Sequence, residues 1–188
     1  MTNESDFIKR LLDQKQREKA FKTLLDLYQK RLYWHIRKIV ITHENADDVL
    51  QNTFLRIYKS LANFKQESSL NTWMYRIAFH ESIRFLALNK KKTFDSLHDI
   101  NNHYLNTLVT DPFFDGDEIQ LKLHNILATL PEKDRQIFQM KYYDDLQFNE
   151  IADVLNINVN TIKTSYYRAA KIIKKNIQEV ELFNETGV

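Results

Sequence analysis

The side chains with the clearest chemical signal lie between Asp153 and Glu179, where five Lys and Arg residues occur without an acid. If residues 159–175 form a helix that turns about 100° per residue, their side chains separate onto two faces. The apolar face contains Val159, Ile162, Tyr166, Ala169, Ile173 and Ile177. The other face contains Asn160, Lys163, Thr164, Tyr167, Arg168, Lys171, Lys174 and Lys175. A helix with such a basic, amide and hydroxyl face suits the DNA major groove, where its groups meet phosphates and base edges.

A short helix and a tight turn must position this basic helix. Residues 148–155 have the apolar spacing of a short helix, and Asn156 tolerates the left-handed backbone that ends one. Asn158 then supplies an N-cap side chain for the next helix. The pattern predicts a helix-turn-helix motif. Structural helical hairpins share this periodicity, so the basic face is the feature that favours DNA binding.

The side chains expected to contact duplex DNA lie on the cap and the first turns of the basic helix. Arg168 has the donors for a bidentate contact with guanine, whereas Lys163 and Lys171 are better suited to phosphates. Tyr167 has a second interpretation, as a surface aromatic without a role. The full set is Asn158, Asn160, Thr161, Lys163, Thr164, Tyr167, Arg168 and Lys171.

A second candidate region, residues 64–84, alternates aromatic rings with cations. Phe64, Trp73, Tyr75 and Phe79 occur among Lys65, Arg76 and Arg84, a composition that can hold unstacked bases of single-stranded nucleic acid. The same spacing also fits ordinary core packing, which we favour for Trp73. Polar residues of the preceding loop, such as Lys65 and Ser68, are better candidates for base contact.

A third candidate surface is polar with one apolar residue. In a helix from Asn45 to Leu61, one face presents Asp48, Gln51, Asn52, Leu55 and Lys59. Leu55 is either an unremarkable exposed apolar residue or an anchor for a partner helix.

The whole chain reads as an all-α protein, because its 188 residues include only two Gly and two Pro, none of them in the first 111 residues. Helices are expected over 17–41, 45–61, 71–88 and 121–130, and from Pro131 to Tyr142, with Trp73, Ile77, Phe79 and Ile83 as core residues of the third. Residues 94–121 carry six acids and no Lys or Arg and are expected to be a flexible linker. We therefore predict two small helical domains, 1–93 and 122–180, followed by a tail, 181–188.

Several classes of function are disfavoured. There are too few glycines for a phosphate-binding loop, no Cys, no metal-type spacing among the six His residues, and no recognisable acid/base pair. We therefore expect no catalytic residues, no cofactor and no metal. No signal segment and no apolar run of about 20 residues occurs, so a cytoplasmic protein without membrane insertion is expected.

Four stretches, 20–28, 44–61, 72–80 and 130–171, resemble the extracytoplasmic-function (ECF) sigma factors of bacterial RNA polymerase, a group of the sigma-70 family. The matching residues in the stretches 44–61 and 72–80 are Ala46, Asp48, Gln51, Thr53, Phe54, Arg56, Thr72, Trp73, Tyr75, Arg76, Ile77 and Ala78. Those in the later block are Leu130, Pro131, Ile151, Ala152, Leu155, Thr161, Lys163, Arg168 and Ala169. These stretches follow the family's order and spacing, with its region two first and its region four second. The resemblance implies that region four is a four-helix domain with a helix-turn-helix.

The resemblance implies a role for each candidate surface. Core RNA polymerase, through its clamp helices and flap, would be one partner, bound by Asp48, Gln51, Asn52 and Leu55. Promoter DNA would be the other, with the basic helix on the upstream element. The downstream element and its opened strand would be held by Phe64, Lys65, Ser68, Asn71, Arg76, His80 and Arg84. An anti-sigma factor is a further expected partner.

Some positions depart from the family pattern. Asn52 stands where an acid is usual, and His80 where Asn is common. Asn156 and Asn160 replace usual glycines. Two rival hypotheses remain at this point: a stand-alone helix-turn-helix transcriptional regulator, and a helical interaction protein that does not bind DNA.

Overall fold

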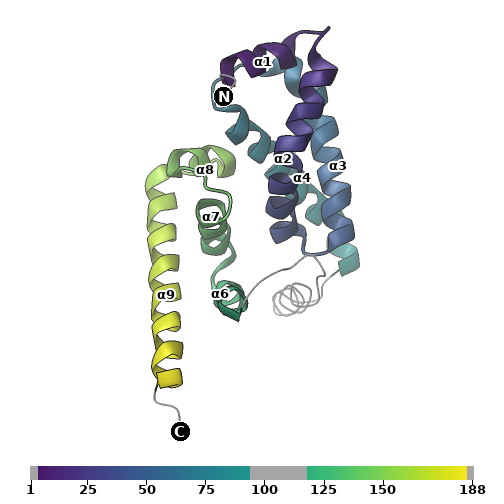
Figure 1. Ribbon diagram of the computed structural model, residues 1–188. Coiled ribbons are helices and arrows are strands. Elements are labelled where there is room, and N and C mark those ends of the chain that lie inside the picture. The colour runs from purple at the N-terminus through teal and green to yellow at the C-terminus, as the bar shows by residue number, and fades with distance from the viewer. Residues whose placement is uncertain (1–3, 94–117, 186–188) are drawn as a thin grey trace. The chain divides into compact units, whose positions relative to one another are not determined.

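The computed structural model describes residues 4–93 and 118–185 (Figure 1). These residues are helical apart from short connections and contain no strand, which confirms the predicted all-α class. The chain divides into two compact units, Met1–Lys90 and Lys91–Val188. Most of the predicted linker, 94–117, and the end of the predicted tail lie outside the described residues.

The first unit contains α1 (Glu4–Leu12), α2 (Arg17–Val40), α3 (His43–Ser60), the short 3-10 helix η1 (Leu61–Asn63) and α4 (Leu70–Thr93). α3 begins two residues before its predicted start because Thr42 is its N-cap, where the hydroxyl accepts a hydrogen bond from the Asn45 N–H at 3.3 Å. α2 and α3 pack against each other, and Leu32, Ile36, Val49 and Ile57 on these helices are buried.

The sequence did not predict α1. Its nine residues form less than three turns, too short for periodicity alone to establish a helix. Tertiary packing stabilises it: Phe7, Ile8 and Leu11 are buried, Leu11 completely. α1 packs against α2 and η1.

The buried face of α4 also differs from the prediction. Trp73, Ile77 and Phe79 are only half-buried, and Ile83 is 37% exposed. The buried apolar residues of this helix are instead Leu70, Met74, Tyr75 and Ala78. Because apolar residues occur on every side of α4, periodicity could not identify the face that meets α2 and α3.

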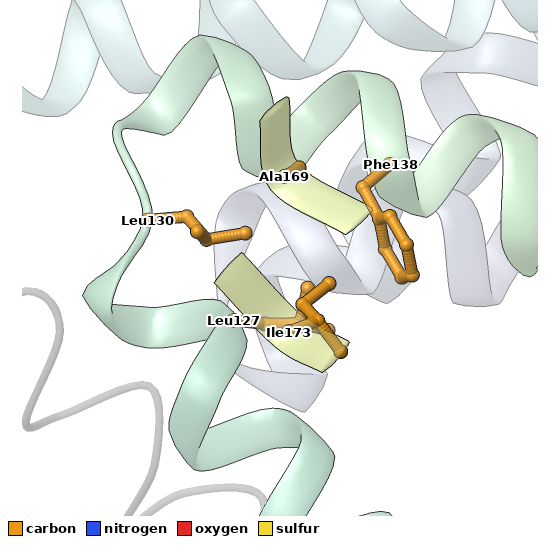
Figure 2. Close-up of a cluster of buried hydrophobic side chains, with 5 residues drawn as sticks. All are labelled: Leu127, Leu130, Phe138, Ala169 and Ile173. Carbon is orange, nitrogen blue, oxygen red and sulfur yellow. The ribbon is translucent and has the colours of Figure 1, made fainter. Parts of the chain in front are cut away.

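The second unit contains α6 (Glu118–Thr129), α7 (Glu132–Tyr142), α8 (Phe148–Leu155) and α9 (Val159–Glu185). α9 packs against the other three. One cluster in the core of this unit contains Leu127, Leu130, Phe138, Ala169 and Ile173 (Figure 2), and it joins α6, the α6–α7 connection, α7 and α9. α6 begins at Glu118, so residues 118–121, expected in the linker, are helical.

The turn between α8 and α9 has the predicted geometry. Asn156 adopts the left-handed conformation, with φ 53° and ψ 49°. The Asn158 Oδ1 accepts a hydrogen bond from the Asn160 N–H at 2.8 Å, as an N-cap does. At the other end of α8, Gln147 and Glu150 form a reciprocal capping box. These local contacts fix where α9 starts and how it leaves the turn.

An ion pair between an exposed arginine and a buried aspartate joins α7 to α9. The Arg168 Nε and Nη2 each donate to the Asp134 carboxylate at 2.6 Å, and the Asp134 side chain is only 1% exposed. The pKa of Asp134 is lowered, chiefly by the hydrogen bond from Arg168, which outweighs the opposing effect of burial; the Ser165 hydroxyl adds to the lowering. The pair therefore fixes the rotation of α9 about its axis relative to α7.

We predict that Asn156→Val destabilises the second unit by about 1–2 kcal/mol, because a β-branched residue is strained in the left-handed region. Asn156→Gly should retain wild-type stability. Asn149→Val, on the exposed side of α8, controls for the change in residue type. Hydrogen exchange of α8 and α9 amides measures the effect. Equal protection in Asn156→Val and the wild type would contradict the strain argument.

The ion pair predicts a dependence of stability on pH. Since folding lowers the Asp134 pKa, its stabilising contribution is complete well above the ordinary Asp pKa of about 3.9. It is lost as the pH falls below that value and through the lowered folded pKa. Calorimetry should therefore show Asp134→Asn melting several degrees below the wild type at pH 7, and a smaller difference near pH 3. Glu132→Gln, an exposed acid on the same helix, is the control. A constant difference at both pH values would refute the assignment.

Candidate nucleic-acid interface

The polar face of α9 lies on the surface, as predicted. All eight residues proposed for duplex contact are exposed: Asn158, Asn160, Thr161, Lys163, Thr164, Tyr167, Arg168 and Lys171. Ile162, Ala169 and Ile173 on the opposite side are buried. The Thr164 hydroxyl donates to the Asn160 carbonyl at 2.9 Å, so it is left to serve as an acceptor. The face is therefore a continuous row of cations, amides and hydroxyls on one helix.

The ion pair with Asp134 changes the interpretation of Arg168. The sequence suggested a guanidinium free to pair with guanine, but its Nε–Nη2 edge is occupied by a buried carboxylate. The arginine side chain remains 57% exposed, and only its other edge, with Nη1, is left for DNA. Arg168 therefore has a structural role that sequence reasoning missed. A substitution there would also leave Asp134 buried without its partner.

Tyr167 stands on an aromatic cluster. Its ring is 62% exposed and lies 5.5 Å from the Tyr166 ring and 6.1 Å from the Phe148 ring, centroid to centroid. Tyr166 is half-buried and stacks on Phe138 at 5.7 Å. The Lys141 ammonium lies 5.7 Å from the Phe148 ring centroid, a cation–π distance. The cluster holds Tyr167 at the surface, between the start of α8 and the polar face of α9.

On α3, the predicted partner-binding residues Asp48, Gln51, Asn52 and Leu55 are all exposed. Leu55 is 57% exposed, so its burial does not contribute to the fold. The Asn52 amide donates to the Asp48 carbonyl at 2.9 Å. Thr53, Phe54 and Ile57 occupy the opposite, buried side of α3. The roles of Asp48, Gln51, Asn52 and Leu55 in binding remain predictions.

A groove of about 220 Å³ lies between α3 and α4. Its lining brings together Asn52, predicted to face the polymerase, and Arg84, predicted to face DNA; the others are Val49, Glu81, Phe85 and Leu88. Beside it, the Arg56 Nε and the Glu81 Oε1 form an ion pair at 2.7 Å. The sequence did not identify this link between the two helices, because the partners are far apart in the chain.

The loop 64–69 and α4 carry the residues proposed for single-stranded DNA. Lys65, His80 and Arg84 are exposed, and Ser68 is half-buried. Phe64 is a correction: it is only 7% exposed, with its ring centroid 4.8 Å from that of Trp73. Since the ring packs inside the unit, it cannot offer a face to a base in this conformation.

Asn71 and Arg76 are half-buried residues on α4. The Asn71 Oδ1 and the Arg76 Nε are both buried, and neither atom has a hydrogen-bond partner within residues 4–93 and 118–185. Buried polar atoms without partners are uncommon in native structures, because losing water without a replacement destabilises the fold. These two residues are therefore unusual members of the proposed DNA-binding set.

Two further properties concern the described residues alone. No helix among them is both long and apolar enough to cross a membrane. Within the same ranges, no group of three or more His, Asp or Glu side chains is arranged to hold a metal ion.

Known families match both units. A model described as Sigma-70 region 2 matches residues 24–92, and one described as Sigma-70, region 4 matches residues 120–173. Among relatives, the RNA polymerase sigma-H factor of Pseudomonas aeruginosa is 29% identical, covering 95% of this chain and 96% of the relative. The ECF RNA polymerase sigma factor SigW of Bacillus subtilis is 27% identical, with coverages of 86% and 90%.

Solved structures share the fold. CnrH, in complex with the cytosolic domain of CnrY, aligns with a TM-score of 0.65 and 17% identity over 92% of this chain and 96% of that one. The sigma factor RpoE of Bartonella quintana, in complex with the anti-sigma factor NepR, aligns with a TM-score of 0.68 and 18% identity, covering 85% and 98%. Two sigma-70 regions in family order, together with relatives aligned along nearly the whole chain, show that this protein belongs to the sigma-70 family of RNA polymerase sigma factors, in its ECF group.

Proposed function

We propose a division of labour among three surfaces of this sigma factor, which binds core RNA polymerase and directs promoter-specific initiation of transcription. The exposed polar faces of α3 and α9, each opposite a buried apolar face, carry the proposal. α3 binds the polymerase, α9 binds the upstream promoter element as a duplex, and the loop 64–69 with α4 binds the opened strand of the downstream element.

For α9, the support is electrostatic and geometric. Lys163, Arg168 and Lys171 are exposed on a helix whose first turn is capped by Asn158. Cations that neutralise phosphates release counterions, so affinity falls steeply with salt. Thr161 and Tyr167 are close enough to the start of the helix to reach base edges, with Tyr167 held outward by the aromatic cluster.

For α3, the support is one exposed leucine. Leu55 lies on a face otherwise formed by Asp48, Gln51 and Asn52, and an apolar anchor within a polar surround is typical of a binding hot spot. The polymerase clamp helices are the proposed partner, and the flap is the proposed contact of the second unit.

For the opened strand, the support is the pair of unsatisfied polar atoms on Asn71 and Arg76. A base bound beside them would supply the missing partners. Lys65, His80 and Arg84 are exposed nearby on the loop and along α4, where they would follow the phosphates. Phe64 contributes by packing on Trp73, which supports the loop from inside.

We propose further that the chain performs no chemistry itself and works in the cytoplasm. An anti-sigma factor is a proposed partner, because RpoE, a sigma factor with a similar fold, was solved in complex with the anti-sigma factor NepR. We propose that residues 1–93 form the domain that binds polymerase and the downstream element. Upstream recognition belongs to the second unit, whose first described helix begins at Glu118.

The test is reconstitution of the full chain with core polymerase, followed by separate measurements of core affinity, promoter binding and start-specific transcripts. Variants of α3 and α9 should lose different activities. If the same activity were lost in both, the division of labour would be wrong.

We predict that Leu55→Ala lowers affinity for core polymerase about tenfold, the effect of removing a moderate hot spot. Because Leu55 is exposed, folding should not change. Leu27→Ala is a matched control, since Leu27 is an equally exposed leucine (59%) on α2. Fluorescence anisotropy with labelled protein measures both affinities. Equal affinity in the two variants would remove Leu55 from the interface.

We predict that Lys171→Ala reduces the slope of log affinity against log salt by about one, because one phosphate contact is lost. The measurement titrates holoenzyme onto duplex DNA carrying the upstream element at several salt concentrations. Lys133→Ala, an exposed lysine on α7, should leave the slope unchanged. An unchanged slope in Lys171→Ala would place this lysine away from the phosphates.

A further inference from the structure

The helix α1 lies at one end of the first unit (Figure 1) and precedes the region 2 match, which begins at residue 24. It packs against η1, and η1 leads directly into the loop 64–69. Phe7, Ile8 and Leu11 of α1 are buried together with Leu61 of η1. α1 therefore supports the residues from which the loop departs.

The other end of the loop also meets α1. The Glu4 Oε1 accepts a hydrogen bond from the Leu70 N–H at 3.2 Å, across 66 positions of sequence. Leu70 is the first residue of α4, where backbone N–H groups have no partner within the helix. The Ser69 hydroxyl accepts from the Thr72 N–H at 3.1 Å. At the start of α4, the Thr72 N–H is thus satisfied by a neighbouring side chain, and the Leu70 N–H by a side chain of α1.

The environment of Glu4 agrees with this placement. Burial is the main cause that raises the pKa of the Tyr28 hydroxyl; Arg31 opposes the rise, and the negative charge of Glu4 adds to it. The carboxylate therefore lies near α2 as well as at the start of α4. The hydrogen bond that it accepts comes from the Leu70 N–H.

The loop itself needs such support. Gln66 has a φ of 57°, in the left-handed region that is unfavourable for a residue with a side chain. Such a conformation persists only where the surrounding structure holds it. The loop is only six residues long, so fixing η1 and Leu70 restricts the conformations open to Lys65 and Ser68 between them.

We propose that α1 positions the loop that binds the opened promoter strand, and that the Glu4 carboxylate is the positioning residue. This proposal rests on the role proposed above for that loop. Glu4 does not itself contact DNA: it holds Leu70, the start of α4, and with them the side chains of Lys65, Ser68 and Asn71. Loss of the carboxylate should leave the loop less ordered before DNA arrives, and binding of the single strand should weaken.

The experiment uses holoenzyme assembled with the full chain and a forked promoter probe, whose downstream element is single-stranded. Glu4→Ala should bind this probe about three- to tenfold more weakly, the range expected for loss of a helix-capping contact. Glu4→Gln keeps an oxygen acceptor and should recover most of the affinity. Asp6→Ala is the matched control: it removes an acid from the same first turn, where Asp6 pairs with Lys9 at the surface, and should bind as the wild type does.

Three measurements separate positioning from other effects. Core affinity and binding to duplex upstream DNA should be the same in all variants. In the free protein, hydrogen exchange at the Leu70 amide should be faster in Glu4→Ala, and close to wild type in Glu4→Gln. Wild-type binding of the forked probe by Glu4→Ala would overturn the proposal, as would an equal loss of core affinity, which indicates general destabilisation. Failure of the wild-type holoenzyme to bind the forked probe would instead refute the function proposed for the loop.

Discussion

α9 presents its cations at the surface because its other face is buried against three helices. Ile162, Ala169 and Ile173 exclude water on one side, and this burial leaves Lys163 and Lys171 on the surface. Apolar packing constrains the rotation of a helix about its axis only loosely, because apolar contacts have no direction. The Asp134–Arg168 pair adds a directional contact at 2.6 Å. The two interactions together set which side chains of α9 face outward.

The first unit applies the same constraint to different chemistry. α3 buries Val49, Phe54 and Ile57, so Leu55 on the other side remains exposed. At the loop 64–69, the ordering contacts come from elsewhere in the chain: the packing of α1 on η1 and the Glu4 carboxylate on Leu70. Both units therefore use buried contacts to hold surface groups in place before a partner binds. Preorganisation of this kind lowers the entropy lost on binding.

The helices, the helix-turn-helix and its caps could be predicted from sequence because their determinants are local. Asn156 and Asn158 act within a few residues of themselves, and the two faces of α9 follow from the periodicity. The exposed positions of Asp48, Gln51 and Leu55 could be predicted in the same way. The buried face of α4 could not be predicted in this way, because apolar residues occur on every side of this helix. The prediction that Phe64 contacts DNA failed because its ring packs on Trp73, which the sequence does not reveal.

The sequence by itself determined the all-α class, the family resemblance, and which residues of α3 and α9 reach the surface, since these depend on composition and spacing along one helix. Tertiary structure alone decided three other features: the formation of α1, the buried side of α4, and the engagement of Arg168 by Asp134. Each depends on residues that are distant in the chain. The energy of burying an apolar side chain or pairing a carboxylate depends on what the fold places beside it, and spacing along the sequence does not contain that information.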